Sequence, residues 1–243
     1  MDEQNVPLFV LPMTLFPGEI QELRIFEPRY RQMLDRCLLD EVPFGLVQND
    51  PFQPIVGWDG PRQHGCEAMI IHHETRGVNH FITIQGGRRF RIRETIPPAL
   101  PPLSDPQFDD LTQEGFLPDL DSILERIPEG SSSQSLYISA NVTFCDELPR
   151  LQEELVEELK EMVSTIVEGA QFPFQMDDDA REALASQIID QYVSDDSNSL
   201  YHVASLVTTN LEQRQQILAC STIEEIIEEL RWHYSHPEDE VEN

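Results

Sequence analysis

Lysine is almost absent from this 243-residue chain, because Lys160 is the single one and arginine supplies the other basic residues. Serine–lysine peptidases need a lysine amine beside their nucleophile, and G-x-x-x-x-G-K-[ST] phosphate loops need one after a glycine-rich turn. Lys160 lies among glutamates, and Ser164, four residues later, has no glycine-rich context. We therefore expect neither peptide hydrolysis nor ATP hydrolysis, and no catalytic residue is assigned.

Paired cysteines and metal-ligand motifs are also missing. The four cysteines stand singly, without a C-x-x-C, so neither a zinc clasp nor a redox pair is indicated and buried free thiols are expected at Cys37, Cys66, Cys145 and Cys220. His72 and His73 are neighbours on a predicted strand and would point to opposite faces, and no tight ligand pair supports Cys66 or His80. The sequence therefore predicts no metal and no cofactor.

Long apolar runs are absent as well. No uninterrupted apolar stretch approaches the ~20 residues that a membrane-spanning helix needs. The start of the chain, residues 1–5, is acidic and polar, unlike the basic and then apolar start of a signal peptide. These features predict a cytoplasmic protein.

Negative charge is abundant and unevenly distributed. The chain carries 45 acidic and 16 basic residues, a net charge of −29. Residues 1–100 hold 13 acids and 10 bases, whereas residues 148–243 hold 22 acids and 5 bases. A surface this acidic repels phosphate backbones and anionic lipids. We therefore expect neither nucleic acid nor membrane as a partner.

The first half of the sequence is typical of short strands with one helix. Apolar runs and alternation predict strands at Val6–Val10, Glu19–Ile25, Pro43–Gln48, Gly65–Glu74, His80–Gln85, Arg88–Ile96 and Leu136–Phe144. Pro28 suits the first turn of a helix whose apolar face repeats at helical spacing through Leu38. Residues 49–64 are expected to form a loop, and seven prolines in residues 97–134 predict an inserted surface loop.

The second half is typical of a helical bundle. Helices are predicted from Leu148 to about Ile166, at Asp177–Val193, at Asn198–Val207, and from two capping boxes that begin at Thr209 and Thr222. The acidic triplet at residues 177–179 is explained as negative charge at a helix start. The domain boundaries expected from these patterns are 1–96 with 135–147, the insertion 97–134, the bundle 148–236, and an acidic disordered tail at 237–243.

Two motifs in the first half resemble a known family. The stretch VPLFVLPMTLFPGEIQELRIFEPRYRQML, followed by PFGLV and later by GCEAMIIHHE and ITIQGGRRFRI, is similar to the opening of the Lon protease N-terminal substrate-binding domain. The family motifs are the LFPG turn, Leu15, Phe16, Pro17 and Gly18, and the helix entry at Phe26, Glu27, Pro28, Arg29 and Tyr30. The resemblance covers residues 6–95 closely and residues 135–235 more loosely.

The resemblance implies an α+β fold: an N-terminal PUA-like pseudo-barrel of mixed strands with one helix, followed by an α-helical bundle. It also implies a non-catalytic module that binds other proteins or unfolded polypeptides, free-standing because the chain ends where a protease would continue into its ATPase. The chain departs from the family pattern by about 40 residues between the arginine-rich strand and the next strand.

One segment is a candidate for peptide contact. Arg89, Arg91 and Arg93 alternate with apolar residues and form the most basic part of the chain, so they are expected on one solvent-facing strand face. That face is either a docking strip, for acidic peptides or for the protein's own helical half, or a solvated surface with weak ion pairs. The helix entry around Glu27 is either a recognition site or a structural device that fixes the helix.

Two other functional classes remain open from the sequence. The first is a regulatory adaptor that docks on another protein through the acidic helical half. The second is a small-molecule enzyme on a PUA-like fold, which the absence of a convergent catalytic set disfavours. An exposed apolar groove would favour the polypeptide binder, and a deep polar pocket with perturbed titratable groups would favour the enzyme.

Overall fold

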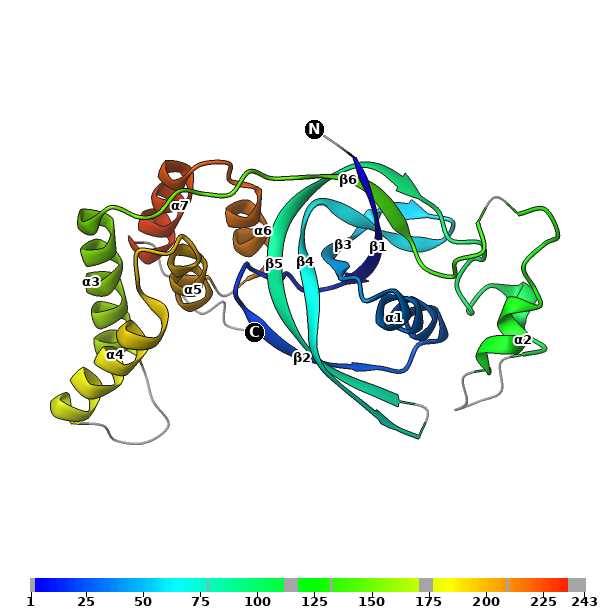
Figure 1. The fold of residues 1–243 in the computed structure, drawn as a ribbon, viewed down its shortest axis with the longest axis horizontal. Coiled ribbons are helices and arrows are strands. Elements are labelled where there is room, and N and C mark those ends of the chain that lie inside the picture. The colour runs from blue at the N-terminus through cyan, green and yellow to red at the C-terminus, as the bar shows by residue number, and fades with distance from the viewer. Residues whose placement is uncertain are drawn as a thin grey trace. The chain divides into compact units, whose positions relative to one another are not determined.

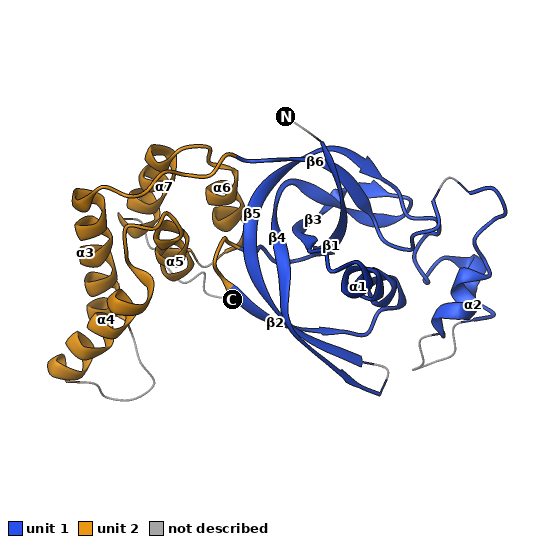
Figure 2. Cartoon of the chain, in the orientation of Figure 1, with its two compact units in different colours: residues 1–15, 20–145 blue, residues 16–19, 146–243 orange. Residues whose placement is uncertain are grey.

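The chain forms two compact units (Figure 2). A computed structural model describes residues 3–77, 79–111, 118–131, 133–170, 177–208 and 210–235. One unit comprises residues 1–15 and 20–145 and is called the barrel unit; the other comprises residues 16–19 and 146–243 and is called the helical unit. The predicted acidic tail at 237–243 and the predicted cap Thr209 lie outside the described residues.

The barrel unit is one sheet that closes on itself (Figure 1). Its strands are β1 (Gln4–Leu11), β2 (Ile20–Ile25), β3 (Phe44–Ile55), β4 (Trp58–Arg76), β5 (Asn79–Ile96) and β6 (Ser139–Phe144). The order is β2-β5-β4-β3-β1-β6, and β5 also pairs with β6, which closes the barrel. β1 and β3 are parallel and every other pair is antiparallel. Helix α1 (Pro28–Asp40) follows β2.

The predicted loop at 49–64 is wrong. β3 runs to Ile55 and β4 begins at Trp58, so a tight turn at Val56 and Gly57 connects them. Both turn residues have positive φ, 50° and 81°, as two-residue hairpin turns of the type I′ class require. Prolines within the segment suggested a loop, but the ladder skips residues between Asp50 and Ile55, which leaves room for Pro51 and Pro54, while Pro61 pairs with Asn49.

The barrel core is organised around Phe90 of β5. This fully buried ring packs with apolar side chains of four other strands, among them Val6, Leu8, Val10, Val47, Ala140 and Val142. A Cβ atom added to Gly45 or Gly65 would lie 2.6 Å from the Phe90 ring, so both strands need glycine where the ring crosses them.

The insertion at 97–134 forms more regular structure than the prolines predicted. It contains a 3₁₀ turn at Pro106–Phe108 and helix α2 (Leu120–Leu124). Leu100, Phe108, Ile123 and Leu136 pack together as a small core of their own. Side chains of α1 hold the segment that returns to β6: Gln32 accepts from the Leu136 amide (2.7 Å), and Arg36 donates to the Tyr137 hydroxyl (3.1 Å).

The helical unit contains α3 (Glu153–Gly169), α4 (Asp178–Tyr192), α5 (Asn198–Val207), α6 (Leu211–Ala219) and α7 (Ile223–Ser235). Helix α3 was predicted to start at Leu148 and instead starts at Glu153; the Leu151 amide donates to the Asp195 carbonyl (2.8 Å) outside the helix. Helix α4 was predicted from an apolar repeat of Ala180, Ala183, Leu184, Ile188 and Tyr192. Ala185 is the one buried residue among those described in this helix, whereas the repeat itself is half-buried at Ala180, Leu184 and Ile188 and exposed at Ala183 and Tyr192.

Two helix starts in this unit use their side chains as predicted. Asp177 accepts from the Ala180 amide (2.8 Å) at the start of α4. At α7, Thr222 accepts from the Glu225 amide (3.2 Å), and the Glu225 carboxylate accepts from the Thr222 amide (3.4 Å), which confirms this capping box. Helix α6 is capped by Asn210, whose side chain accepts from the Gln213 amide (2.9 Å).

Part of the LFPG motif belongs to the helical unit. Phe16 is fully buried there, 5.6 Å from the Tyr201 ring, and the Arg214 guanidinium lies 4.2 Å from the centre of the Phe16 ring. Glu19 pairs with Arg214 (2.6 Å) and also accepts from the Phe16 amide (2.8 Å). Gly18 has a φ of 77°, which glycine adopts readily and which explains the last position of the motif.

Candidate functional site

The Glu27-Pro28-Arg29 sequence marks the start of α1. Glu27 has an extended backbone as the N-cap residue, and Pro28 occupies the first turn, where its missing N–H costs nothing. The Glu27 side chain does not cap the helix and instead accepts a hydrogen bond from Arg29 Nε (2.9 Å). The carboxylate is therefore available beside the helix start.

Arg29 is held between two aromatic rings. Its guanidinium carbon lies 3.7 Å from the centre of the Trp58 ring and 4.1 Å from the centre of the Tyr30 ring. Tyr30 is itself fixed, because its hydroxyl donates to the Val10 carbonyl (2.8 Å) and burial raises the pKa of Tyr30 far above its usual range. Cation–π contacts with the two rings orient the guanidinium, whose N–H groups remain able to form hydrogen bonds.

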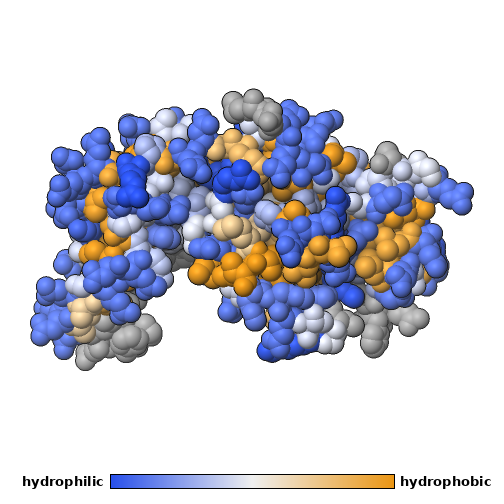
Figure 3. Space-filling view, viewed as in Figure 1, coloured by the Kyte–Doolittle hydropathy of each residue, from blue (hydrophilic) through white to orange (hydrophobic). Residues whose placement is uncertain are grey.

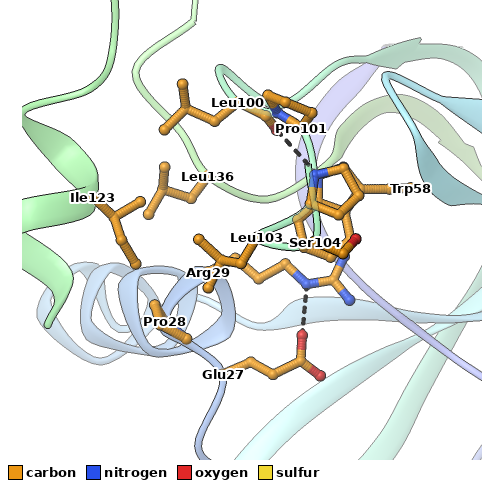
Figure 4. Close-up of a pocket in the computed structure, with 11 residues that line it drawn as sticks. Glu27, Pro28, Arg29, Trp58, Leu100, Pro101, Leu103, Ser104, Ile123 and Leu136 are labelled. Carbon is orange, nitrogen blue, oxygen red and sulfur yellow. Dashed lines mark hydrogen bonds and ion pairs between the residues drawn. The ribbon is translucent and has the colours of Figure 1, made fainter. Parts of the chain in front are cut away.

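A pocket of about 260 Å³ opens beside this ion pair (Figure 4). The start of α1 and Trp58 of β4 contribute one side. The insertion contributes most of the remainder through Leu100, Pro101, Pro102, Leu103, Ser104 and Ile123, and Leu136, just after the insertion, completes the lining. Trp58 Nε1 donates to the Leu100 carbonyl (3.0 Å) and so ties the strand to the insertion. Figure 3 shows apolar surface gathered between α1 and α2.

The lining allows binding more readily than catalysis. Glu27 and Arg29 are its two charged members, and they neutralise one another. Among the described residues that line it, Ser104 is the one hydroxyl side chain, and none is a histidine, cysteine or lysine. What the pocket offers is an apolar volume with the Glu27 carboxylate as acceptor and the Arg29 guanidinium as donor at its rim.

The predicted face of three arginines on β5 is not formed. Arg89 is buried, with 5% of its surface exposed, whereas Arg91 and Arg93 are exposed. Alternation holds over this stretch, because Phe90 and Ile92 are buried between the arginines, and the bulge in the β5–β6 ladder lies farther along, between Ile92 and Glu94. Sequence alternation therefore placed Arg89 on this face but did not show that it would be covered. Arg93 donates to the Thr143 hydroxyl (2.9 Å), and Arg91 lies beside the side-chain amide of Gln63.

Arg88 has a different role from its neighbours. Its Nε and Nη2 donate to the two carboxylate oxygens of Glu67, both at 2.8 Å, and its guanidinium lies 3.8 Å from the centre of the Phe144 ring. The Glu67 side chain is 8% exposed, so this bidentate pair satisfies a nearly buried carboxylate. A Cβ atom at Gly87 would lie 3.2 Å from the Glu67 Cβ, which favours glycine before Arg88.

Two histidines that the sequence did not bring together meet across the β4–β5 hairpin. His73 Nε2 and His80 Nδ1 lie 3.0 Å apart, with the Thr75 hydroxyl 3.3 Å from each. Burial lowers the pKa of His80, which favours the neutral ring that a histidine–histidine hydrogen bond requires. The observed register places Thr75 opposite His80, which brings His73, two residues before Thr75, beside the His80 ring. No group of three metal-ligating side chains occurs among the described residues.

Lys160 and the cysteines have structural surroundings. Lys160 Nζ pairs with Glu157 (2.7 Å), and the Ser164 hydroxyl donates to the Lys160 carbonyl (3.0 Å) within the same helix. All four cysteines are free thiols, but only Cys37 and Cys66 are buried, so the expectation of four buried thiols is wrong for Cys145 and Cys220.

The family described as the ATP-dependent protease La (LON) substrate-binding domain matches residues 5–231. The chain belongs to the LON substrate-binding domain family. The predicted resemblance is therefore confirmed.

Solved structures agree on the fold of this LON-family chain. A Lon N-terminal domain protein from Xanthomonas campestris superposes with a TM-score of 0.55 at 18% identity, covering 94% of this chain and 98% of that one. The N-terminal domain of a Mycobacterium avium complex Lon protease gives 0.59 at 15% identity, covering 98% and 100%. These matches confirm the predicted α+β fold. No curated protein matches this chain. Among the described residues, no helix has both the length and the apolar character to cross a membrane.

Proposed function

We propose that this LON-family chain binds segments of other polypeptides and does not cleave them. The observation that carries the proposal is the family match over residues 5–231, since the family is defined by substrate binding. The pocket at the start of α1 supports it with an apolar volume and a neutral hydrogen-bonding rim. The surroundings of Lys160 support the non-catalytic part, because that amine pairs with Glu157.

The partner classes follow from charge. A net charge of −29 disfavours nucleic acid and anionic membranes, so polypeptides are the proposed partners. A cytoplasmic location is part of the same proposal and is supported by four free thiols, which persist most readily in reducing compartments.

Binding to an unfolded, iodoacetamide-alkylated reporter protein, labelled with fluorescein, is the direct test. Fluorescence anisotropy should rise on titration with the chain, while the same reporter in its native fold gives no rise. Incubation should leave the reporter intact on a gel, with or without ATP. Absence of binding to the unfolded reporter would contradict the first half of the proposal, and fragments that a point mutation in this chain abolishes would contradict the second.

Arg91 and Arg93 remain candidates for a second contact with acidic segments. Both are exposed, and partly desolvated guanidinium–carboxylate contacts are worth roughly 1.5–3 kcal/mol. The double variant Arg91→Ser/Arg93→Ser should weaken capture of acidic clients and reduce its salt dependence. Arg89 is left unchanged in this test because it is buried and its replacement would disturb the barrel. Unchanged capture with an unchanged melting curve would assign both arginines to a solvated face.

A further inference from the structure

We propose that the pocket beside α1 takes one apolar side chain of a bound polypeptide together with the adjoining peptide group. This inference rests on the proposed function and names what the site recognises. It also gives the insertion a role: the segment that departs from the family pattern supplies Leu100, Leu103, Ser104 and Ile123 of the lining.

The size of the pocket favours a single side chain. Its volume is about 260 Å³. A protein cavity of ~150 Å³ is enough to hold benzene, whereas drug-sized ligands and cofactors occupy pockets of roughly 300–1,000 Å³. A leucine, methionine or phenylalanine side chain fits this range with room for part of the main chain, and a nucleotide-sized cofactor does not.

The walls favour an apolar side chain. Leu100, Ile123 and Leu136 are each 5% exposed or less, and prolines 101 and 102 add further apolar surface. Burying a leucine or phenylalanine side chain against such walls raises affinity by roughly ten- to a hundredfold over alanine. A charged side chain would lose its hydration there without a partner.

The rim matches a peptide group better than a charged one. Two rings, Trp58 and Tyr30, lie against the Arg29 guanidinium, and among the described residues it donates through Nε alone, to Glu27 Oε2. Arg29 Nη1 and Nη2 are therefore left as donors, and Glu27 Oε1 as an acceptor. The side chains are 16% and 35% exposed, so a ligand can reach both. A peptide group supplies the complementary carbonyl and N–H, and the neutral ion pair gives no preference for a charged ligand.

Short, amide-capped peptides test this reading. The series has the form fluorescein-Gly-Ser-Xaa-Ser-Gly-NH₂ with Xaa as Leu, Phe, Ala or Asp. The Leu and Phe probes should bind at least about tenfold more tightly than the Ala and Asp probes, with little change between low and high salt. A probe with N-methylleucine should lose about tenfold, because it cannot donate to Glu27 while its side chain is unchanged.

The protein supplies its own reporter and a matched pair of variants. Trp58 and Trp232 are the two tryptophans, so Trp232→Phe leaves Trp58 as the single emitter, and binding should change its emission. Ser104→Phe should fill the pocket from its exposed rim and weaken the Leu probe at least about tenfold. Gln107→Phe, an exposed position of the same insertion outside the lining, should change affinity less than about twofold.

The outcomes separate the two proposals. Equal binding of the Leu probe and of the unfolded reporter by wild type and Ser104→Phe would overturn the pocket assignment and leave polypeptide binding intact. Preference for the Asp probe, or binding lost in moderate salt, would overturn it in favour of the arginine strand. Failure of the wild-type chain to bind the unfolded reporter, with Trp58 still responding to the Leu probe, would overturn the proposed function and leave the pocket assignment standing.

Discussion

At the scale of single residues, the stability of the barrel is most sensitive to substitution where the Phe90 ring crosses the backbone of a neighbouring strand. Phe90 leaves no room for a side chain at Gly65, where a Cβ atom would also lie 2.2 Å from Val47 Cγ1. Gly65→Ala should therefore lower the free energy of unfolding by about 1–3 kcal/mol, the usual cost of overpacking a core, in urea titrations. Gly169→Ala is the matched control, because nothing lies within 4 Å of its added methyl group, and it should be neutral or slightly stabilising. Equal effects would contradict the packing argument.

The thiols provide a second prediction at this scale. Burial raises the pKa of Cys37 from 9.0 to about 11, and Cys66 is fully buried. Native protein at pH 8 should react rapidly with Ellman's reagent at two thiols, Cys145 and Cys220, and at all four after denaturation. Cys145→Ser and Cys220→Ser should each remove one fast-reacting thiol. The pKa of Cys37 is raised in the folded state, so the neutral thiol contributes its full stabilisation of the fold below pH 9. That contribution is lost as the pH rises from 9 to 11. Rapid labelling of four native thiols would contradict this burial.

At the scale of elements, the start of α7 depends on its capping box. Thr222→Ala removes the side-chain acceptor of the Glu225 amide and should cost about 1 kcal/mol of stability, measured as a shift of the urea midpoint. Ser221→Ala is the control: Ser221 contributes its backbone amide to Glu225 (2.6 Å), so its change should stay within about 0.5 kcal/mol. A larger loss for Ser221→Ala than for Thr222→Ala would show that the cap does not stabilise the helix.

Helices α4 and α5 show when an apolar repeat in the sequence predicts burial correctly. Helix α5 was predicted with its observed bounds, Asn198–Val207, and its apolar repeat is buried as expected. The repeat in α4 is equally regular in sequence, yet that helix buries Ala185 alone among its described residues. Periodicity shows that a helix can present an apolar face, but burial requires another element to pack against that face.

At the scale of the whole molecule, charge should govern stability. The net charge of −29 destabilises the compact state, because folding brings the acidic side chains closer together and so increases their mutual repulsion. Raising sodium chloride from ~0.02 to ~0.3 M should shorten the screening length several-fold and raise the melting temperature by a few degrees. Potassium chloride at the same ionic strength should act equally, because the effect is screening. A melting temperature that is constant or falls with salt would show that favourable ion pairs, such as Arg231–Glu158, outweigh the repulsion.

The sequence by itself determined the kinds of elements, the family and several local devices. Pro28 at a helix start and the Thr222 capping box depend on neighbouring residues, because local conformational preferences act over a few positions. The tertiary structure alone decided that Arg89 is buried, that Phe16 packs in the helical unit, and that His73 meets His80. It also brought Glu27, Trp58 and the insertion together around one pocket. Those outcomes depend on bulges, strand register and barrel closure, which set contacts between residues far apart in the chain and leave no periodic trace in the sequence.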